Sequence, residues 1–428
     1  MNQVGVALVG YGTIGCGVIE ILQDQMDLIF KRSGVRMDLT WVIDKDLTTP
    51  RRVPVKKAKT SSNYQDALKD PNTQIIIELV GGVGFAYTLI EESLKAGKNV
   101  VTANKALLAE KGTALFQLAK EKRLAIGFEA SVCGGIPIIR TISEALIADN
   151  IRSINAIVNG TTNYILTKMF EENQNFSDAL AQAQKLGFAE ADPTLDIGGH
   201  DAAHKAAILA SMAFNTVIDY DHVHTEGINK IELEDVRNAQ QLGYVIKLLA
   251  IAKLDPDNTV EVRVNPTLVP INNQLASVRN EYNAVLVDSD FLGQSMYFGK
   301  GAGSKPTATA VVADIVDTAM FINEVEKTTK LYVFNNYPLK PIGDIESRYY
   351  LRFLIMDKPG VLSNISGIFA QHNISIASVI QKERSETDYV PLIMTTHSAQ
   401  EKNILKALDE IEHESYNKSR GVLIRILD

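Results

Sequence analysis

The residues best suited to chemistry lie in one stretch, Gly187 to Lys205, which reads GFAEADPTLDIGGHDAAHK. Within it a single lysine, Lys205, follows four carboxylates, which are Glu190, Asp192, Asp196 and Asp201. Carboxylates can hold the ammonium group of an amino-acid substrate, and a lysine ammonium can act as a proton donor. A structural cluster on a solvated helix would show the same residues, with each exposed pair worth about a few tenths of a kcal/mol. Both interpretations remain open at this point in the chain.

A helix must position this lysine. Ala206 to Phe214 is an apolar, alanine-rich run typical of a buried helix, and Gly198-Gly199 punctuates the chain just before it. Asp201 and Lys205 are four residues apart, so a helix that includes both places their side chains on one face. The spacing therefore predicts an Asp201–Lys205 pair at the start of a buried helix.

The N-terminal residues predict a dinucleotide site. The apolar run Val4 to Val9 is followed at once by Gly10-Tyr11-Gly12-Thr13-Ile14-Gly15 and then by a helical pattern from Val18 to Phe30. Between a strand and a helix, such glycines allow a tight turn and a close approach to a pyrophosphate at the helix N-terminus. A tight turn that binds nothing is the alternative. A second glycine-rich loop, Gly299 to Gly303, precedes a helical segment, Ala308 to Ile322, which we expect to return to the first domain and bring its loop to the same dinucleotide.

Charged residues follow two of the predicted strands. Leu39 to Ile43 ends in Asp44-Lys45, where an acid favours NAD by binding a ribose hydroxyl and a base favours NADP by accepting its 2′-phosphate. The cofactor preference therefore stays open. Lys105 follows the strand Asn99 to Thr102, and ligands of parallel sheets bind beyond the carboxyl ends of strands. Lys105 is thus placed to meet cofactor or substrate, with an ordinary lysine at a helix start as the alternative.

The loop Glu129 to Pro137 combines glycines, whose carbonyls can be exposed, with the carboxylate of Glu129. Oxygen ligands of this kind suit a hard cation. Cys133 in the same loop has the residue type of a thiol nucleophile, but no histidine lies near it in sequence, which favours a small packing cysteine. A further group has the residue types of a metal site, namely Asp219, Asp221, His222 and His224. An exposed polar turn is the favoured interpretation there, because nothing else indicates zinc.

Composition narrows the function classes. The chain has 428 residues, 46% of them hydrophobic, which predicts a globular protein of several domains. A net charge of −8 with no basic run argues against general nucleic-acid binding. Two cysteines provide no disulfide framework, and no signal peptide or membrane-spanning run is recognisable. A soluble cytoplasmic protein is the expectation.

Taken together, the motifs resemble the homoserine dehydrogenase family, in its longer form with a C-terminal ACT domain. Four of them carry the resemblance over essentially the whole chain: GYGTIG, TANK, GFAEADPTLDIGGHDAAHK and GKGAGSKPTATAVVAD. DKPGVLSNISGIFAQHNISI, from Asp357, resembles the ACT signature. The resemblance implies NAD(P)-dependent, reversible oxidation of L-homoserine to L-aspartate 4-semialdehyde, a step towards threonine and methionine.

Strands that alternate with helices predict a parallel, doubly wound sheet in the first part of the chain, and the order βαββαβ predicts a ferredoxin-like fold in the last. The expected fold class is therefore α/β and α+β. We expect a Rossmann NAD(P)-binding domain over 1–130 plus 303–330 and a mixed α+β substrate-binding and dimerisation domain over 131–302. A linker over 331–348 and an ACT domain over 349–428 complete the chain.

The resemblance also implies roles for individual residues. Lys205 matches the catalytic proton donor and Lys105 a second active-site lysine that also binds substrate. Three acids match the lining of the substrate site, namely Glu190, Asp196 and Asp201. The monovalent-cation loop, for sodium, corresponds to Glu129, Val132, Gly134 and Ile136, the last three through backbone carbonyls. Positions that match cofactor contacts are Thr13, Ile14, Gly187 and Gly303, which add to the predicted contacts of Gly10, Gly12, Gly15, Lys45 and Lys105.

The same resemblance implies the partners of this protein, and two alternative functions compete with it. It implies an amino-acid effector of the ACT domain, such as threonine, and a homodimer or homotetramer. Where the family often has an arginine after the second strand, this chain has Asp44-Lys45, so NADP is only slightly favoured over NAD. One rival is an aspartate-semialdehyde dehydrogenase with Cys133 as nucleophile. The other is a sensor that binds NAD(P) and an amino acid without turnover.

Overall fold

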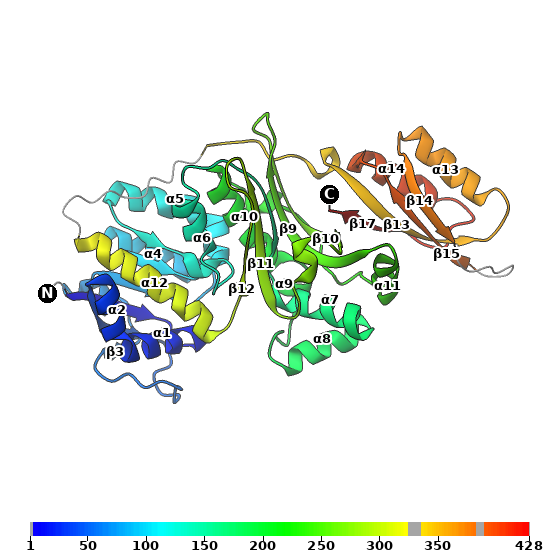
Figure 1. The fold of residues 1–428 in the computed structure, drawn as a ribbon. Coiled ribbons are helices and arrows are strands. Elements are labelled where there is room, and N and C mark those ends of the chain that lie inside the picture. Colours follow the sequence, from blue (N-terminus) through cyan, green and yellow to red (C-terminus); the bar gives the residue numbers. More distant parts are fainter. Residues whose placement is uncertain (1–2, 324–334, 382–388, 428) are drawn as a thin grey trace.

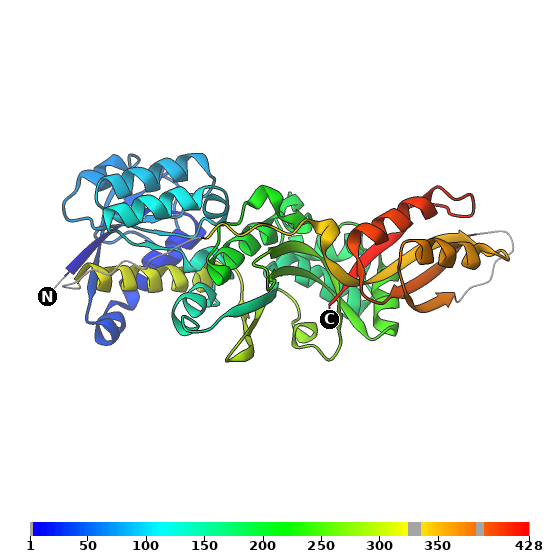
Figure 2. The same ribbon diagram turned by 90° about the horizontal axis from the view of Figure 1, so that it is seen from above.

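The computed structural model describes residues 3–323, 335–381 and 389–427. Figures 1 and 2 show an elongated molecule with the N-terminal α/β domain at one end, the C-terminal domain at the other and a mixed sheet between them. Within the described ranges, no helix has the length and apolar character that a membrane crossing requires.

The N-terminal domain is built on a six-stranded parallel sheet in the order β3-β2-β1-β4-β5-β6. Its strands are β1 (Gln3–Val9), β2 (Arg36–Ile43), β3 (Lys59–Ser61), β4 (Ile75–Glu78), β5 (Asn99–Thr102) and β6 (Ile126–Gly127). The apolar strands are buried on both faces, as expected for a parallel sheet covered by helices. This order is that of dinucleotide-binding domains, and it confirms the predicted doubly wound fold.

Helices cover both faces of this sheet. They include α1 (Thr13–Asp24), α2 (Met26–Ser33), α4 (Gly84–Lys95), α5 (Lys105–Lys122) and, from far along the chain, α12 (Ser304–Asn323). α12 lies against α1, as both views show. The helix predicted over Val18 to Phe30 is wrong in one respect, because the backbone leaves the helical region at Gln25 (φ −114°, ψ 8°) and divides it into α1 and α2.

The middle of the molecule is a largely antiparallel sheet with helices packed against it. Its strands are β7 (Ile151–Ile157), β9 (Tyr244–Leu254), β10 (Val260–Pro270), β11 (Tyr282–Ser289) and β12 (Gly293–Lys300). The helices that concern the site are α7 (Gly160–Glu172), α8 (Phe176–Lys185), α9 (Thr194–Ile197) and α10 (His200–Phe214), of which α10 packs on β9 and β10. Asn175 caps α8, and its side chain accepts from the Asp178 amide at 3.0 Å.

The C-terminal domain confirms the predicted βαββαβ order. It comprises β13 (Glu346–Met356), α13 (Val361–Gln371), β14 (Ile376–Gln381), β15 (Tyr389–Thr396), α14 (Glu401–Glu412) and β17 (Val422–Ile426). β17 also pairs in parallel with β10, at Thr267↔Arg425 and Leu268↔Ile426. One eleven-stranded sheet therefore runs through the middle and C-terminal domains.

The predicted linker is attached to the middle domain where the structure describes it. Its first residues, 331–334, lie outside the described ranges. Beyond them, the Val260 amide donates to Pro338 O at 2.9 Å, and the Lys340 amide donates to Val260 O at 2.8 Å. Lys340 also pairs with Asp255. These contacts extend the edge of β10 and fix the chain before β13.

Candidate active site

Asp201 joins two lysines from different domains. Its Oδ2 lies 2.7 Å from Lys205 Nζ, one turn further along α10, which confirms the predicted pair. Its Oδ1 lies 3.1 Å from the Nζ of Lys105, the first residue of α5 in the N-terminal domain. The Lys105 side chain is 37% exposed whereas that of Lys205 is 11% exposed, so the cluster has one open and one enclosed ammonium.

Lys205 is held in its charged form. Its ammonium donates to Asp201 and, at 2.7 Å, to the backbone carbonyl of Val158 at the end of β7. Burial lowers the pKa of Lys205, but the adjacent Asp201 carboxylate outweighs burial and raises the pKa above its usual value. Burial raises the pKa of Asp201 in turn, and the two lysines outweigh it and hold that pKa well below the usual range.

Asn159 links the two partly buried acids of the cluster. Its Nδ2 donates to Asp196 Oδ1 at 2.7 Å and to Asp201 Oδ2 at 2.9 Å. Its Oδ1 caps α7 by accepting from the Thr162 amide at 2.9 Å. Burial raises the pKa of Asp196, whose Oδ2 accepts from Thr161 Oγ1 at 3.2 Å. Asn159 was missed as a site residue in the sequence, where Asn159-Gly160 has only the pattern of a polar turn after a strand.

The other acids of the central stretch lie at the surface. Glu190 is exposed, and its backbone carbonyl accepts from Gln184 Nε2 at 3.1 Å. Asp192 is exposed too, and its Oδ1 accepts from the amide of Thr194, the first residue of the short helix α9, at 3.1 Å. Gly187 ends α8 with φ 77°. The structure thus brings Asp196 and Asp201 to the lysines and leaves Glu190 and Gly187 on the adjoining surface.

His204 is a further residue beside the lysines that sequence reasoning missed. Its ring stacks on Tyr220, with centroids 4.1 Å apart and an angle of 12° between the rings. Burial, together with the nearby Lys105 ammonium, lowers the pKa of His204 to about 4. A neutral imidazole therefore flanks the two ammonium groups at neutral pH.

The first glycine-rich loop has the shape that a pyrophosphate needs. Gly10 has φ 108°, and a Cβ there would lie 2.6 Å from Leu79 O. A Cβ on Gly15 would lie 2.2 Å from Gly10 O, so α1 packs too closely for any side chain. At Gly12, by contrast, a Cβ would meet no atom within 4 Å, which leaves open space in front of the helix that begins at Thr13. These residues fit a nicotinamide dinucleotide.

The second glycine-rich loop lies against the first. Gly303 has φ 114° and directly precedes α12. Ser304 Oγ donates to Thr13 O at 2.7 Å, at the N-terminus of α1. A Cβ on Gly17 would lie 2.9 Å from the Cβ of Ala308. The two loops, 291 residues apart at Thr13 and Ser304, thus share one edge of the N-terminal domain.

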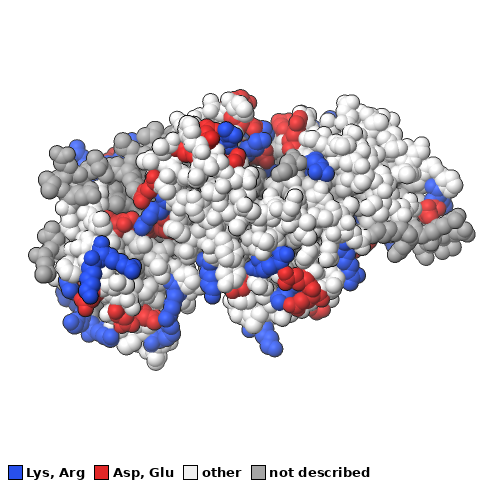
Figure 3. Space-filling model, in the orientation of Figure 1, with Lys and Arg blue, Asp and Glu red and all other residues white. Residues whose placement is uncertain are grey.

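The carboxylate after β2 is engaged by the protein itself. Asp44 Oδ2 accepts from the amide of Tyr11, within the glycine-rich loop, at 2.6 Å, and Oδ1 accepts from the Asp46 amide at 2.9 Å. Lys45 Nζ lies 5.8 Å from the centre of the Phe85 ring. Arg51 lies 3.8 Å from Asp44. Basic side chains gather over this end of the molecule, around α1, α2 and β3 (Figure 3).

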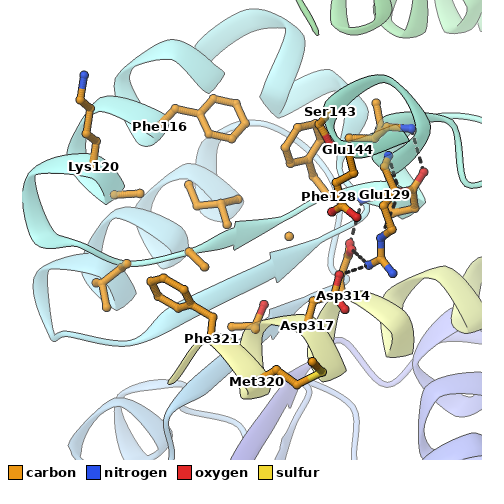
Figure 4. A pocket seen from close by; sticks show the side chains of 18 residues that line it. Phe116, Lys120, Phe128, Glu129, Ser143, Glu144, Asp314, Asp317, Met320 and Phe321 are labelled. Carbon is orange, nitrogen blue, oxygen red and sulfur yellow. Dashed lines mark hydrogen bonds and ion pairs between the residues drawn. The ribbon is translucent and has the colours of Figure 1, made fainter. Parts of the chain in front are cut away.

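The predicted cation loop has its carboxylate turned towards a helix. Glu129 is buried and accepts from the amides of Ile139 and Arg140, each at 2.9 Å, at the start of α6 (Ile138–Arg140). Figure 4 shows Glu129 close to Asp314. Arg140 lies 3.8 Å from Glu129 and pairs with Asp314 at 3.1 Å. The cavity drawn there, of about 550 Å³, lies between α5, β6 and α12. The described residues that line it include none of the lysine cluster.

Cys133 has the environment of a packing residue. It is fully buried, and its Sγ accepts from Asn283 Nδ2 at 3.6 Å. Burial raises the pKa of its thiol to about 11, so a nucleophilic thiolate is not available at neutral pH. Across the described ranges no cluster of three or more histidine, cysteine and acidic residues suits a metal ion. His222 pairs with Asp219 and His224 with Glu226, as in a polar turn.

Comparison with known proteins gives concordant matches. Residues 137–316 match the sequence model of homoserine dehydrogenase, 10–129 that of the homoserine dehydrogenase NAD binding domain and 349–413 that of the ACT domain. A homoserine dehydrogenase of Neisseria gonorrhoeae is 39% identical over 420 residues, which are 96% of each chain. The solved structure of a homoserine dehydrogenase from Thiobacillus denitrificans superposes with a TM-score of 0.95 at 39% identity and covers 100% of this chain and 99% of its own. A hyperthermophilic archaeal homoserine dehydrogenase in complex with NADPH has a TM-score of 0.64 at 27% identity, over 76% of this chain and 100% of its own.

Proposed function

This chain belongs to the homoserine dehydrogenase family, and we propose that Lys205, Asp201 and Lys105 form its catalytic centre. The enzyme interconverts L-homoserine and L-aspartate 4-semialdehyde with a nicotinamide cofactor. The observation that carries the proposal is the single carboxylate of Asp201, which holds one buried and one half-exposed ammonium within 3.1 Å.

The charges of this cluster match those of the reaction. A bound nicotinamide supplies or accepts the hydride. Reduction of the aldehyde builds negative charge on the carbonyl oxygen, and an ammonium next to that oxygen stabilises the charge and gives up a proton. Lys205 is the proposed donor because its proton is retained at neutral pH by Asp201. In the direction of homoserine oxidation, the deprotonated amine of Lys205 takes the hydroxyl proton.

The substrate carries an ammonium and a carboxylate, so its site needs both acidic and basic side chains. We assign its ammonium to the acids Glu190, Asp196 and Asp201, and its carboxylate to Lys105. Asp196 and Asp201 are already fixed by Asn159. Glu190 lies on an exposed segment between α8 and α9, so its contribution requires that this segment meets the substrate.

We propose NADP as the slightly preferred cofactor. Both oxygens of Asp44 accept backbone amides, which supports the view that this acid shapes the loop rather than binding a ribose hydroxyl. Lys45 is then the residue for a 2′-phosphate. The remaining cofactor residues are assigned to the two glycine-rich loops and to Gly187: Gly10, Gly12, Thr13, Ile14, Gly15 and Gly303.

A monovalent cation, sodium by preference, is proposed for the loop from Glu129 to Ile136. Because the Glu129 carboxylate caps α6, the backbone carbonyls of Val132, Gly134 and Ile136 would supply the oxygen ligands. Activity in sodium-free buffer with tetramethylammonium, followed by titration with NaCl, tests this: recovery on titration supports the site, and full activity without sodium refutes it.

We also propose the domain division, the cellular location, the oligomeric state and the effector of this protein. The division into 1–130 plus 303–330, 131–302, 331–348 and 349–428 is supported by the packing of α12 on α1. Cytoplasmic location is supported by two free, buried cysteines. Homodimer or homotetramer formation is supported by exposed apolar side chains such as Phe291 and Phe298. An amino-acid effector such as threonine is proposed for the ACT domain.

The test of this function is the formation of reduced nicotinamide with L-homoserine, measured separately with NAD and NADP and with and without L-threonine. Reduction of either cofactor is expected, with NADP the faster. Inhibition by threonine would assign the effector. Folded protein that reduces neither cofactor would contradict the assignment and favour a sensor that binds without turnover.

A further inference from the structure

A buried arginine of the C-terminal domain is shared between two domains. Arg425, in β17, is 1% exposed and pairs with Glu401 of its own domain through Nε, at 2.9 Å, and through Nη2. Its Nη1 and Nη2 also donate to Glu226 of the middle domain, at 3.1 and 2.9 Å. Each carboxylate thus accepts two hydrogen bonds from the guanidinium, in a fixed bidentate geometry. Together the two carboxylates compensate the charge of the guanidinium, which would be costly to bury alone.

Glu226 begins a turn that packs on the substrate site without any gap. Its amide donates to Val264 O of β10 at 2.7 Å. At the next residue, Gly227, a Cβ would lie 2.0 Å from Ile197 O and 2.6 Å from Gly198 Cα. The Ile228 amide then donates to Ile197 O at 2.8 Å. The turn 226–228 and the end of α9 are thus in direct backbone contact.

The corner at Ile197 to Gly199 separates the two partly buried acids of the site. Asp196 precedes it, and its carbonyl accepts from the Gly199 amide at 3.0 Å. Gly199 has φ 86° and begins α10, which carries Asp201 and Lys205. The position of this corner therefore determines where the Asp196 carboxylate and the first turn of α10 lie.

We propose that Arg425 is a positioning residue for the substrate site and acts through Glu226. The buried guanidinium of Arg425 fixes the Glu226 carboxylate and with it the turn 226–228. The turn packs against the corner at 197–199, and the corner orients Asp196 and Asp201. The inference rests on the proposed substrate roles of these two acids. It makes the C-terminal domain a structural part of the substrate site.

A second ion-pair cluster at the same domain boundary provides a matched control. Arg352 of β13 pairs with Asp235 at 2.7 Å and with Glu234 at 3.4 Å, at the start of α11 (Leu233–Gln241). Glu234 is more exposed than Glu226 and also meets an arginine of the C-terminal domain. It lies on α11 rather than on the turn against α9. Glu234→Gln therefore removes a carboxylate from an arginine at the same domain boundary without touching the corner.

The experiment compares Glu226→Gln, Glu226→Asp, Glu234→Gln and Asp196→Asn in the full chain. Glu226→Gln is expected to raise KM for L-homoserine about tenfold, because small displacements of binding groups are costly. Its KM for NADP should match that of Glu234→Gln, which keeps normal KM values. Its melting temperature should fall, because Arg425 stays buried with one carboxylate fewer. Glu226→Asp, which retains the charge, should restore most of the substrate affinity.

The outcomes distinguish a failure of the positioning role from a failure of the proposed substrate site. Normal KM for L-homoserine in Glu226→Gln, with a raised KM in Asp196→Asn, would overturn the positioning role and leave the proposed substrate site intact. Normal KM in Asp196→Asn as well would overturn the proposed site. A rise in the KM of substrate and cofactor alike would show a general loss of structure and would also refute the inference.

Discussion

Asp201 and Lys205 lie one turn apart on α10, with carboxylate and ammonium 2.7 Å from each other. Both side chains are almost entirely buried, so the pair differs from an exposed i,i+4 contact, in which solvent screens the charges. The carboxylate raises the pKa of the lysine against the effect of burial. Asp201 therefore determines the pH at which Lys205 releases its proton.

Replacement of Asp201 by asparagine should shift the pH dependence of homoserine oxidation. This direction needs the deprotonated amine of Lys205, so the wild-type rate should climb with pH beyond the usual lysine pKa. Without the carboxylate, burial lowers the pKa of Lys205 against weaker opposition, with Asp196 still raising it, and the pH of half-maximal kcat should fall by at least about one unit. Asp192→Asn, an exposed acid of the same stretch, should keep the wild-type profile. Coincident profiles for all three proteins would rule out the control of Lys205 by Asp201.

Gly227→Ala should damage both stability and activity. The added methyl group would lie 2.0 Å from the backbone oxygen of Ile197, and neither side can yield without moving the site corner. A loss of about 1–3 kcal/mol in the free energy of unfolding is expected, as for overpacked cores. Gly84→Ala is the control, since a Cβ at the start of α4 meets no atom within 4 Å. Equal unfolding midpoints in denaturant for the two variants would show that the turn and α9 are not in tight contact.

Lys247 should make stability depend on pH. It is buried in β9 and donates to Asn163 Oδ1 at 2.8 Å and to Val278 O. Burial, aided by the charge of Arg279, lowers its pKa to about 7. The unfolded chain, with a lysine pKa of about 10.4, then binds more protons than the folded chain between these values, so stability rises with pH across this window.

Lys247→Met removes this dependence. Relative to the variant, wild-type protein should gain about 2 kcal/mol in the free energy of unfolding between about pH 7 and about pH 9. Denaturant titrations at both pH values measure it, with Lys253→Met, an exposed lysine of the same strand, as the control. A difference from wild type that stays constant with pH would mean that Lys247 titrates alike in the folded and unfolded chains.

Lys45→Glu should reverse the proposed cofactor preference. The substitution places a carboxylate where a 2′-phosphate would lie, so KM for NADP should rise at least about tenfold while KM for NAD changes little. Lys57→Glu, an exposed lysine in the loop that follows β2, controls for the change in overall charge. If both variants weaken NADP binding equally, Lys45 has no specific contact with the phosphate.

The sequence was most informative where chemistry and structure coincide locally. The Asp201–Lys205 pair followed from helical spacing, and the glycine loop before α1 from its place between strand and helix. Two features were out of reach because they depend on tertiary contacts. Asn159 meets Asp201 across 42 residues, and Arg425 meets Glu226 across 199.

Secondary structure was misjudged for related reasons. β9 was not recognised, because its almost uninterrupted apolar run, YVIKLLAIAKL, has no period that separates a buried strand from a helix. The division between α1 and α2 falls at Gln25, with no proline or glycine to mark it. The pairing of β17 with β10 joins two domains that sequence patterns describe as separate units.

The most direct measurement is the kcat for reduction of L-aspartate 4-semialdehyde by Lys205→Ala, with Lys168→Ala as the control. Lys168 forms an i,i+4 pair with Glu172 on α7, so its loss removes a similar helix contact outside the lysine cluster. Lys205→Ala should lower kcat at least about a hundredfold, the usual scale for a lost general acid, while NADPH still binds and the protein stays folded. Lys168→Ala should turn over normally. Near-normal turnover by folded Lys205→Ala would contradict the assignment of Lys205 as the proton donor.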